Sequence, residues 1–555
     1  MMKLTSVTAI ATAASLALSA PVLADDNNSM PNLKILDEFS TGWVRNFNPW
    51  FGGRHNFSYE ALMLFDLLDD SKEHYFLATG YEMSDDLTEL TVNLREGVKW
   101  SDGKPFTADD VVFSFEYPTK HPEIDVTGLA TKIEKIEKVD DYTVKITLKE
   151  ANAFAAQDVI GEQTKIVPKH IWEGISSPAA ETNPNPVATG PFTEVARFTP
   201  QVYILCKNPH YWNTELSVNC VEFPQFASND AALELLAKGE VDWGGIFIPD
   251  IDRTYANKNP NNKYWFPSSD GVRLTLNYKT ENEGALKAFN DLNFRKAVSL
   301  SMDREAMMYI GAYGYVSGDN PATNLPTAQW RWRDAEADKI WQDLAKYDIE
   351  AAKTLLSEAG FKDVSGDGFV ENPDGSKLNF RIQVPSGWSD WVNNTSIAVE
   401  GLRAAGINAT VVTPEVNAYS SNWESANFDA QFGGGSLQSS VWKFYDFTMH
   451  SRYQKTPMWW STASTNYVNE QVDQWIEELG QTKDEAKQKE IVAKIERHMA
   501  ENVIQIPLYY NGVWYTYNDS RFEGFANAED PFVHPAPWDG MSRFVHILNI
   551  KPKQQ

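Results

Sequence analysis

Cysteine is scarce in this chain, because Cys206 and Cys220 are the only two among 555 residues. The nine histidines are scattered, so the sequence offers no group of ligands with the spacing of a zinc, nickel or haem site. In an oxidising compartment, a lone and closely spaced cysteine pair is more typical of a disulfide than of a metal site. We therefore expect no cofactor and a Cys206–Cys220 disulfide, which stabilises by about 3 kcal/mol in the chain-entropy model.

Positive charge and long apolar runs are scarce as well. The chain has 49 basic residues against 76 acidic ones, a net charge of -27. A charge of this sign excludes nucleic acid or an anionic membrane surface as the main ligand, and it mainly favours solubility. Beyond the N-terminus, no stretch approaches the roughly 18 uninterrupted apolar residues of a membrane helix.

The N-terminus reads as a signal peptide. Lys3 precedes an apolar run at 7–20, and Val22-Leu23-Ala24 forms a small-x-small cleavage site. We expect cleavage after Ala24, which removes one cation and leaves 531 residues (555 minus 24) with a net charge of -28 (48 minus 76). No cysteine lies near this site to carry a lipid tether, so the sequence predicts a free protein in the periplasm of a Gram-negative cell. A chain of this length accommodates two or three domains.

Strand and helix patterns alternate along the mature chain. Around residues 91–115 a strand-like stretch is followed by the turn Ser101-Asp102-Gly103 and a helix, and Thr107 with Asp110 has the spacing of a capping box. Further strands are expected at 144–148, 202–205, 378–384, 408–412 and 506–517, and further helices at 168–172, 229–238, 291–304, 348–359, 396–405 and 483–499. This alternation predicts α/β lobes with mixed sheets.

The segment LREGVKWSDGKPFTADDVVFSF at 94–115 closely resembles the signature of family 5 extracellular solute-binding proteins. These are the dipeptide, oligopeptide, nickel and oligosaccharide receptors of ABC importers. Further matches follow in the order of the family, at 188–192, 208–212, 239–243, 294–297 with 303–304, and 352–360. The resemblance covers nearly the whole mature chain.

The resemblance implies an α/β fold of the two-lobed periplasmic binding protein type (type II, cluster C), with an extra domain inserted in the first lobe. Two hinge strands join the lobes, and the ligand is buried between them when they close. The expected division is a signal peptide at 1–24, lobe one at 25–60, 188–285 and 524–555, the inserted domain at 61–187 and lobe two at 286–523. The implied partner is the pair of permease subunits in the inner membrane, and the expected state is a monomer.

The ligand class depends on one segment of the second lobe. Peptide-binding members of the family usually carry a Trp-x-x-Asp-like segment there, whose carboxylate holds the α-ammonium of the ligand. The corresponding stretch here, 432–442, reads FGGGSLQSSVW and has no acid. A buried ammonium without a counter-charge costs several kcal/mol. An oligopeptide or dipeptide receptor is therefore the alternative interpretation.

Tryptophan is abundant, with 19 residues. Most of them are expected to fill the core, but sugar sites also pair aromatic rings with polar side chains. The strings at 44–50, 249–255, 387–390 and 537–540, with the cysteine loop, resemble chitin-oligosaccharide receptors of the same family, although Gly434 and Ser436 depart from their pattern. We therefore predict a β-linked oligosaccharide ligand, either a chito-, cello- or manno-oligomer. The predicted ligand contacts are Arg45, Asn46, Phe47, Asn229, Trp388, Asp390, Trp442, Trp459 and Trp538.

Two further motifs carry weaker hypotheses. Asp363, Ser365, Asp367 and Asp374 have the spacing of a calcium loop, but Asp-Gly pairs are also ordinary turn chemistry. Asp390 and Asp539 could serve as the two carboxylates of a glycoside hydrolase. The family is not hydrolytic, so the resemblance implies a receptor rather than an enzyme.

Overall fold

The computed structural model describes residues 31–37, 42–51, 57–69, 72–318, 321–434, 437–455 and 465–554. The predicted signal peptide at 1–24 and the predicted contact Trp459 lie outside these ranges. Among the helices of the described ranges, none is both long enough and apolar enough to cross a membrane.

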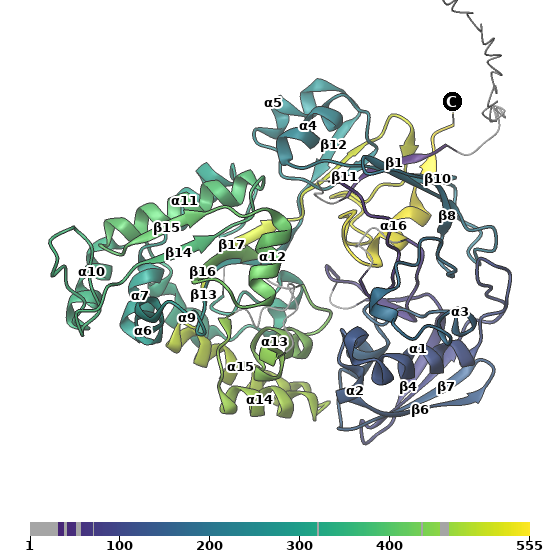
Figure 1. Cartoon of the computed structure of the whole chain (residues 1–555), viewed down its shortest axis with the longest axis horizontal. Coiled ribbons are helices and arrows are strands. Elements are labelled where there is room, and N and C mark those ends of the chain that lie inside the picture. Colours follow the sequence, from purple (N-terminus) through teal and green to yellow (C-terminus); the bar gives the residue numbers. More distant parts are fainter. Residues whose placement is uncertain are drawn as a thin grey trace, which may run out of the picture.

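The first lobe is built on a mixed seven-stranded sheet in the order β12-β18-β11-β1-β10-β9-β8. The short central strand β1 pairs in parallel with both β10 and β11, and the outer strands pair antiparallel. Helix α16 contributes to the apolar core of this lobe (Figure 1). The elements are β1 (Leu33–Leu36), β8 (Phe192–Phe198), β9 (Val202–Lys207), β10 (Cys220–Pro224), α4 (Asn229–Ala237), β11 (Trp243–Gly244), α5 (Ile251–Thr254), β12 (Asn262–Trp265), β18 (Tyr515–Asn518), β19 (Phe522–Glu523), α16 (Ser542–Asn549) and β20 (Lys551–Pro552).

A four-stranded antiparallel sheet, in the order β4-β5-β7-β6, has a hydrophobic core of its own. Alternate residues of β7, from Val144 to Leu148, are buried, as expected for a strand with one covered face. Helix α1 begins at the predicted capping box, with Thr107 and Asp110 each accepting from the backbone of the other. The elements are β2 (Met63–Phe65), β3 (Glu73–Tyr75), β4 (Ala78–Met83), β5 (Glu89–Leu94), α1 (Ala108–Lys120), α2 (Leu129–Lys132), β6 (Ile133–Asp140), β7 (Thr143–Leu148), η2 (Ala156–Ile160) and α3 (Lys169–Trp172).

The second lobe is built on a five-stranded sheet in the order β15-β14-β16-β13-β17. Strands β14, β15 and β16 run parallel, while β13 is antiparallel to both of its neighbours. The elements are β13 (Ser268–Leu276), α6 (Glu283–Asn290), α7 (Leu292–Leu300), α8 (Arg304–Ala306), α9 (Ala335–Leu344), α10 (Ile349–Glu358), β14 (Phe380–Gln383), α11 (Ser389–Ala404), β15 (Ala409–Val412), α12 (Val416–Glu424), β16 (Ala430–Gly434), α13 (Val441–Met449), α14 (Glu470–Gly480), α15 (Glu485–Asn502) and β17 (Ile506–Gly512).

The chain crosses between the lobes twice, and the two crossings lie side by side. Trp265 pairs with Tyr515 in the first sheet, and Ser268 pairs with Gly512 in the second. Between them, the Val513 amide donates to the Pro267 carbonyl at 2.8 Å. The hinge therefore lies at 266–267 and 513–514. This corrects the expected boundaries at 285/286 and 523/524, because β13 belongs to the second sheet and β18 to the first.

Two expected elements are divided in the structure. The stretch 506–517 forms β17 and β18 in different sheets, because the chain crosses the hinge immediately after Gly512. The stretch 291–304 forms α7, which ends at Leu300, and a separate α8. The Asp303 side chain accepts from the Ala306 amide and starts this second helix, a capping role that a periodicity pattern does not show.

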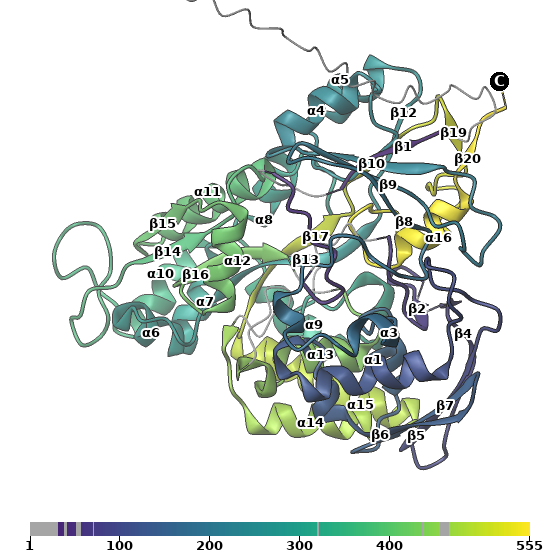
Figure 2. The same ribbon diagram turned by 45° about the vertical axis from the view of Figure 1, so that its right-hand side comes forward.

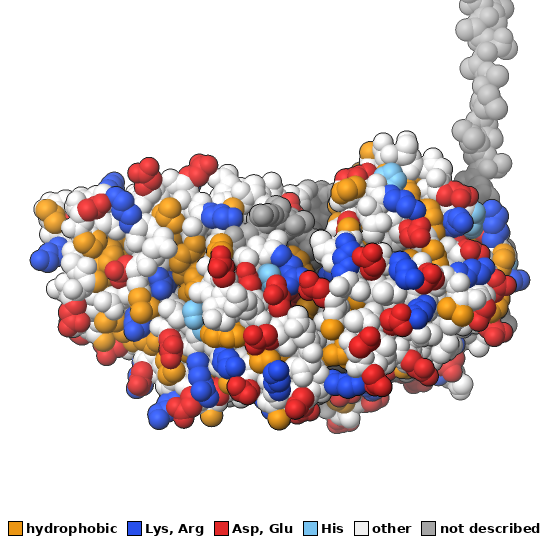
Figure 3. Space-filling view, turned by 90° about the horizontal axis from the view of Figure 1, so that it is seen from below, with side chains coloured by type: hydrophobic (Ala, Val, Ile, Leu, Met, Phe, Trp, Pro, Cys, Tyr) orange, Lys and Arg blue, Asp and Glu red, His pale blue; other side chains and the backbone are white. Residues whose placement is uncertain are grey.

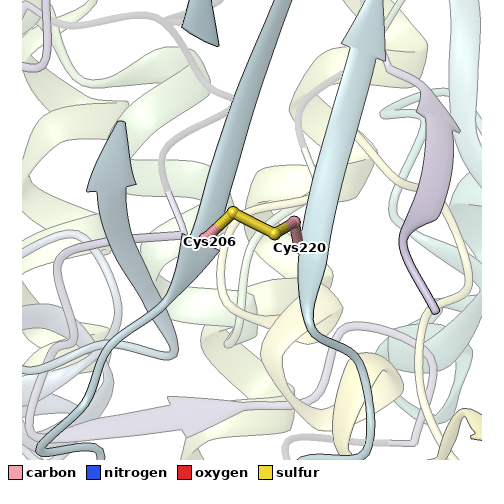
Figure 4. Close-up of a disulfide and its surroundings, with 2 residues drawn as sticks. All are labelled: Cys206 and Cys220. Atoms are coloured by element: carbon pink, nitrogen blue, oxygen red, sulfur yellow. A yellow bond between two sulfur atoms is a disulfide. The ribbon is translucent and has the colours of Figure 1, made fainter. Parts of the chain in front are cut away.

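The predicted disulfide is confirmed. Cys206 of β9 and Cys220 of β10 lie opposite each other in the antiparallel pair and are bonded through sulfur (Figure 4). The bond closes a loop with a sequence separation of 14 residues. It therefore ties the two strands at the end of their shared ladder.

Replacing both cysteines, as Cys206→Ser with Cys220→Ser, should lower the free energy of unfolding of this lobe by about 3 kcal/mol. The reason is the added conformational freedom of the unfolded loop. Urea denaturation followed by tryptophan fluorescence measures the loss, and wild type in excess reductant should show the same loss. Equal stability of oxidised and reduced wild type would contradict the structural role of the bond.

Candidate functional site

The lobes touch where a loop of the second meets a helix of the first. The Asn229 side-chain amide donates to the Ser389 hydroxyl at 3.2 Å, and the Asn229 backbone amide donates to the Gly387 carbonyl at 3.4 Å. Gly387 has a φ of +84°, and a Cβ there would lie 3.1 Å from the Ala227 carbonyl oxygen. Glycine therefore permits both the turn and the close approach of the two chains.

Asn229 thus contacts the residues on either side of Trp388, and Asp390 follows in the first turn of α11. The loop 384–388 follows β14, whose carboxyl end lies at the same edge of the sheet as that of the parallel strand β16. In open α/β sheets, ligands bind in the crevice at the carboxyl ends of parallel strands. Trp388 therefore lies at the edge of the sheet where ligands of such folds bind, and its role as a ligand contact stays a prediction.

The surroundings of Asp390 shift its ionisation. The side chain is only 3 % exposed, and burial raises the pKa of Asp390 to about 7, although the Asp390 and Trp391 backbone amides act in the opposite direction. Next to it, Trp388 is partly exposed and its ring lies edge-on to Trp391, with centroids 4.8 Å apart. A carboxyl group with this pKa can both accept and donate a hydrogen bond near neutral pH.

The first lobe contributes His534, Trp538 and Asp539 to the boundary. His534 lies edge-on to Trp538 at 5.5 Å, and its Nδ1 is 3.3 Å from an Asp539 oxygen. Burial lowers the pKa of His534 to about 4, against the attraction of carboxylates that include Asp270 of β13 in the second lobe. His534 is therefore neutral at pH 7, and its contact with Asp539 is not an ion pair.

A small cavity of about 20 Å³, with room for about one water molecule, opens between the lobes. Phe65 and the segment 157–163 form one wall, and 437–443 forms the other. Its charged side chains among the described residues are Glu162 and Lys443. Burial, followed by the proximity of Asp539, raises the pKa of Glu162, which accepts from the Met541 amide at 2.8 Å.

Lys443 extends from α13 into the boundary and is 5 % exposed. Burial lowers its pKa to about 8, and neighbouring Lys132 acts in the same direction. The carboxylates of Asp158, Glu162 and Asp446 oppose the shift. The wall of the cavity on the second lobe thus carries a cation among neutral groups, Gln438 and Ser439.

Among the described residues, none of the predicted ligand contacts lines this cavity. The exposed Arg45 side chain donates to the Pro184 carbonyl and to Asn185, and the Asn46 side chain accepts from the Asn48 amide. Phe47 is 4 % exposed and belongs to the core of the first lobe. Trp442 is 5 % exposed and donates to the Ile476 carbonyl at 3.0 Å, so the core of the second lobe holds its ring.

Comparison with known proteins identifies the family. Residues 73–455 match the bacterial extracellular solute-binding proteins, family 5 Middle. The chain belongs to this family. Its members are transport receptors rather than enzymes, and the chain is a substrate-binding protein of an ABC importer.

Among the relatives of this family 5 protein, the "Oligopeptide-binding protein AppA" of Bacillus subtilis is 27% identical over 432 residues, 76% of this chain and 75% of that protein. The "Periplasmic alpha-galactoside-binding protein" of Rhizobium meliloti is 27% identical over 346 residues, 55% of this chain and 49% of that protein. A mannohexaose-bound periplasmic oligopeptide-binding protein of Thermotoga maritima superposes with a TM-score of 0.86 and 26% identity, over 95% of this chain and 99% of that one. This last match confirms the two-lobed fold.

The cavity of this family 5 protein also contains residues that the sequence interpretation missed. Glu162, Gln157 and Lys443 come from segments nearly 300 residues apart, and none belongs to a motif. Lys443 directly follows Trp442, at the end of the segment that lacks the acid of peptide receptors. This position next to Trp442 was the sequence signal for Lys443, but the sequence does not show that the lysine, rather than the tryptophan, faces the cavity.

The acidic side chains that cluster in the predicted calcium loop are not the predicted set. Carboxylate atoms of Asp363, Asp367 and Glu371 lie within 4.8 Å of one another in an exposed loop. Asp374, which the spacing had included, instead contacts Lys287 at 2.6 Å. The Asp363 carboxylate accepts from two backbone amides of its own loop, which is the ordinary bonding of such a turn.

Replacing Asp390 by asparagine should make the stability less dependent on pH. The folded-state pKa of about 7 lies above the ordinary value for an aspartate, so the stability that this group contributes is present in acid and is lost as the pH rises from about 4 through about 7. The stability difference, Asp390→Asn minus wild type, should therefore be more favourable to the variant at pH 8 than at pH 4.5. Melting temperatures at the two pH values measure this, and a difference that stays constant would contradict it.

Proposed function

We propose that this protein is a periplasmic receptor that binds a β-linked oligosaccharide between its lobes and delivers it, as a monomer, to the permease subunits of an ABC importer. The observation that carries the proposal is the contact of Asn229 with the loop that holds Trp388, across the lobe boundary. A partly exposed indole offers a flat face to the C–H side of a pyranose ring. The amide and hydroxyl groups of Asn229 and Ser389, at the same contact, suit the hydroxyls at the rim of that ring.

The wall of the cavity supports a ligand without an ammonium group. Gln438, Ser439 and Lys443 line it on the second lobe, where a peptide receptor would be expected to present a carboxylate. Lys443 carries positive charge below its pKa of about 8. A like charge on the ligand would be repelled in this partly desolvated space, whereas amides and hydroxyls accept and donate to a neutral sugar.

The relatives point to two ligand classes. The T. maritima protein of the same fold was solved with mannohexaose, and the R. meliloti relative is named for α-galactosides. The B. subtilis relative is named for oligopeptides, which keeps a peptide receptor as the second candidate. The acid-free segment 437–442 and Lys443 favour the sugar.

Thermal unfolding of the mature protein against chitobiose, cellobiose, mannobiose, xylobiose and tri-alanine tests the ligand class. A disaccharide at 100 times its dissociation constant should add about 2.7 kcal/mol of stability and raise the melting temperature by a few degrees. Tri-alanine should give no shift. A shift with tri-alanine alone would overturn the oligosaccharide proposal in favour of the peptide receptor.

Trp388→Ala should abolish the response to the disaccharide while the protein remains folded, since the stack is lost and the indole is only partly buried. Trp475→Ala is the matched control, because Trp475 is also partly buried but lies on α14, where its ring faces His498. This control should keep the response. Isothermal titration of both variants measures the change, and equal affinities would exclude Trp388 from the site.

A further inference from the structure

Beside the cavity, the segment 152–160 of the inserted part of the chain touches the helices α13 and α14 of the second lobe. The rings of Phe154 and Trp442 are nearly parallel, with an interplanar angle of 7° and centroids 6.3 Å apart. The Ala153 amide donates to the Gly480 carbonyl at 2.7 Å. Glycine is required at 480, because a Cβ there would come within 2.8 Å of the Trp442 indole nitrogen. The inserted part thus makes two contacts here: the Phe154 ring packs on Trp442 of α13, and the Ala153 amide donates to the end of α14.

A buried ion pair also links the segment 152–160 to α13. The Lys443 ammonium donates to the Gln157 carbonyl at 3.2 Å and lies 3.9 Å from Asp158. Lys132 contacts the same Asp158 oxygen at 2.7 Å. The Lys443 and Asp158 side chains are 6 % and 2 % exposed, so this attraction is only weakly screened by solvent.

These contacts lie far from the hinge. In Figures 1 and 2, α13, α14 and the inserted sheet lie side by side at the lower end of the lobe boundary, and the crossing strands lie above them. Figure 3 views this lower end, where the surfaces of the two halves meet. A rotation about the hinge moves the most distant points furthest, so opening the lobes breaks the Phe154–Trp442 and Asp158–Lys443 contacts first.

We propose that the Phe154–Trp442 stack, the Ala153–Gly480 hydrogen bond and the Asp158–Lys443 pair form a latch that populates the closed form without a ligand. Phe154 and Asp158 are then positioning residues, which act on the ligand site through the angle between the lobes. If only the closed form binds the ligand with full affinity, the apparent dissociation constant equals that of the closed form divided by the fraction of molecules that are closed. The latch therefore strengthens binding of any ligand class, and its test needs no ligand.

Hydrogen exchange resolved to single amides, on the ligand-free mature protein, tests the latch. The Ala153 amide should be protected in wild type, because its acceptor lies across the lobe boundary. In Phe154→Ala combined with Asp158→Asn, its exchange should be faster by about tenfold or more, since opening becomes more frequent. The neighbouring Asn152 amide donates to the Leu87 carbonyl within the inserted part and should stay slow in both proteins.

The matched control is Phe113→Ala combined with Asp109→Asn. These substitutions remove a ring and a carboxylate from α1, where Phe113 stacks on Tyr117 and Asp109 contacts Lys138. Ala153 should keep wild-type protection in this control. If Asn152 loses protection in the latch variant, Asp158→Asn alone replaces it, with the same expected direction for Ala153. An unprotected Ala153 in ligand-free wild type, or unchanged protection in the latch variant, would overturn the proposal.

Discussion

Two neighbouring strand crossings hold the lobes together, and the arrangement of every residue at the boundary depends on them. Each lobe has its own sheet and its own apolar core, so that each behaves as a rigid body. In the part of the chain that the structure describes, the backbone passes from one sheet to the other at 266–267 and 513–514. Phe266 and Trp514 pack edge-on at 5.1 Å, and Phe247 of the first lobe lies at the same distance from Trp514. The angle set at this aromatic hinge decides which side chains of the two lobes meet.

Titratable groups on both sides of the boundary are buried. The pKa of Asp390 rises to about 7, that of His534 falls to about 4 and that of Lys443 falls to about 8, and burial is the main cause in each case. Desolvation of this kind opposes closure unless hydrogen bonds or opposite charges compensate it. At Lys443 the compensation comes from Gln157 and Asp158. At Asp390 it comes from the backbone amides of Asp390 and Trp391.

Local patterns predicted most of the elements, because helix caps, alternating burial and turns are decided within a few residues. The capping box at Thr107, the strand at 144–148 and the helix at 229–238 are present nearly as expected. Asn229 and Trp388 were both predicted as ligand contacts through the family resemblance, and Asn229 meets the loop of Trp388 across the boundary. Phe47 was predicted as a contact from the resemblance at 44–50, and Trp442 from its place near the departing residues Gly434 and Ser436. Neither signal distinguishes a core ring from an exposed one.

The sequence by itself determined the family, the α/β character of the lobes and the disulfide between Cys206 and Cys220. These features rest on short strings and on spacing, which are read directly from the order of residues. Only the tertiary structure decided where the hinge lies, that Glu162 and Lys443 share a cavity, and that Trp442 meets Phe154 across the boundary. Such contacts join residues hundreds of positions apart. Their geometry follows from how two separately folded lobes close on each other, which no local pattern encodes.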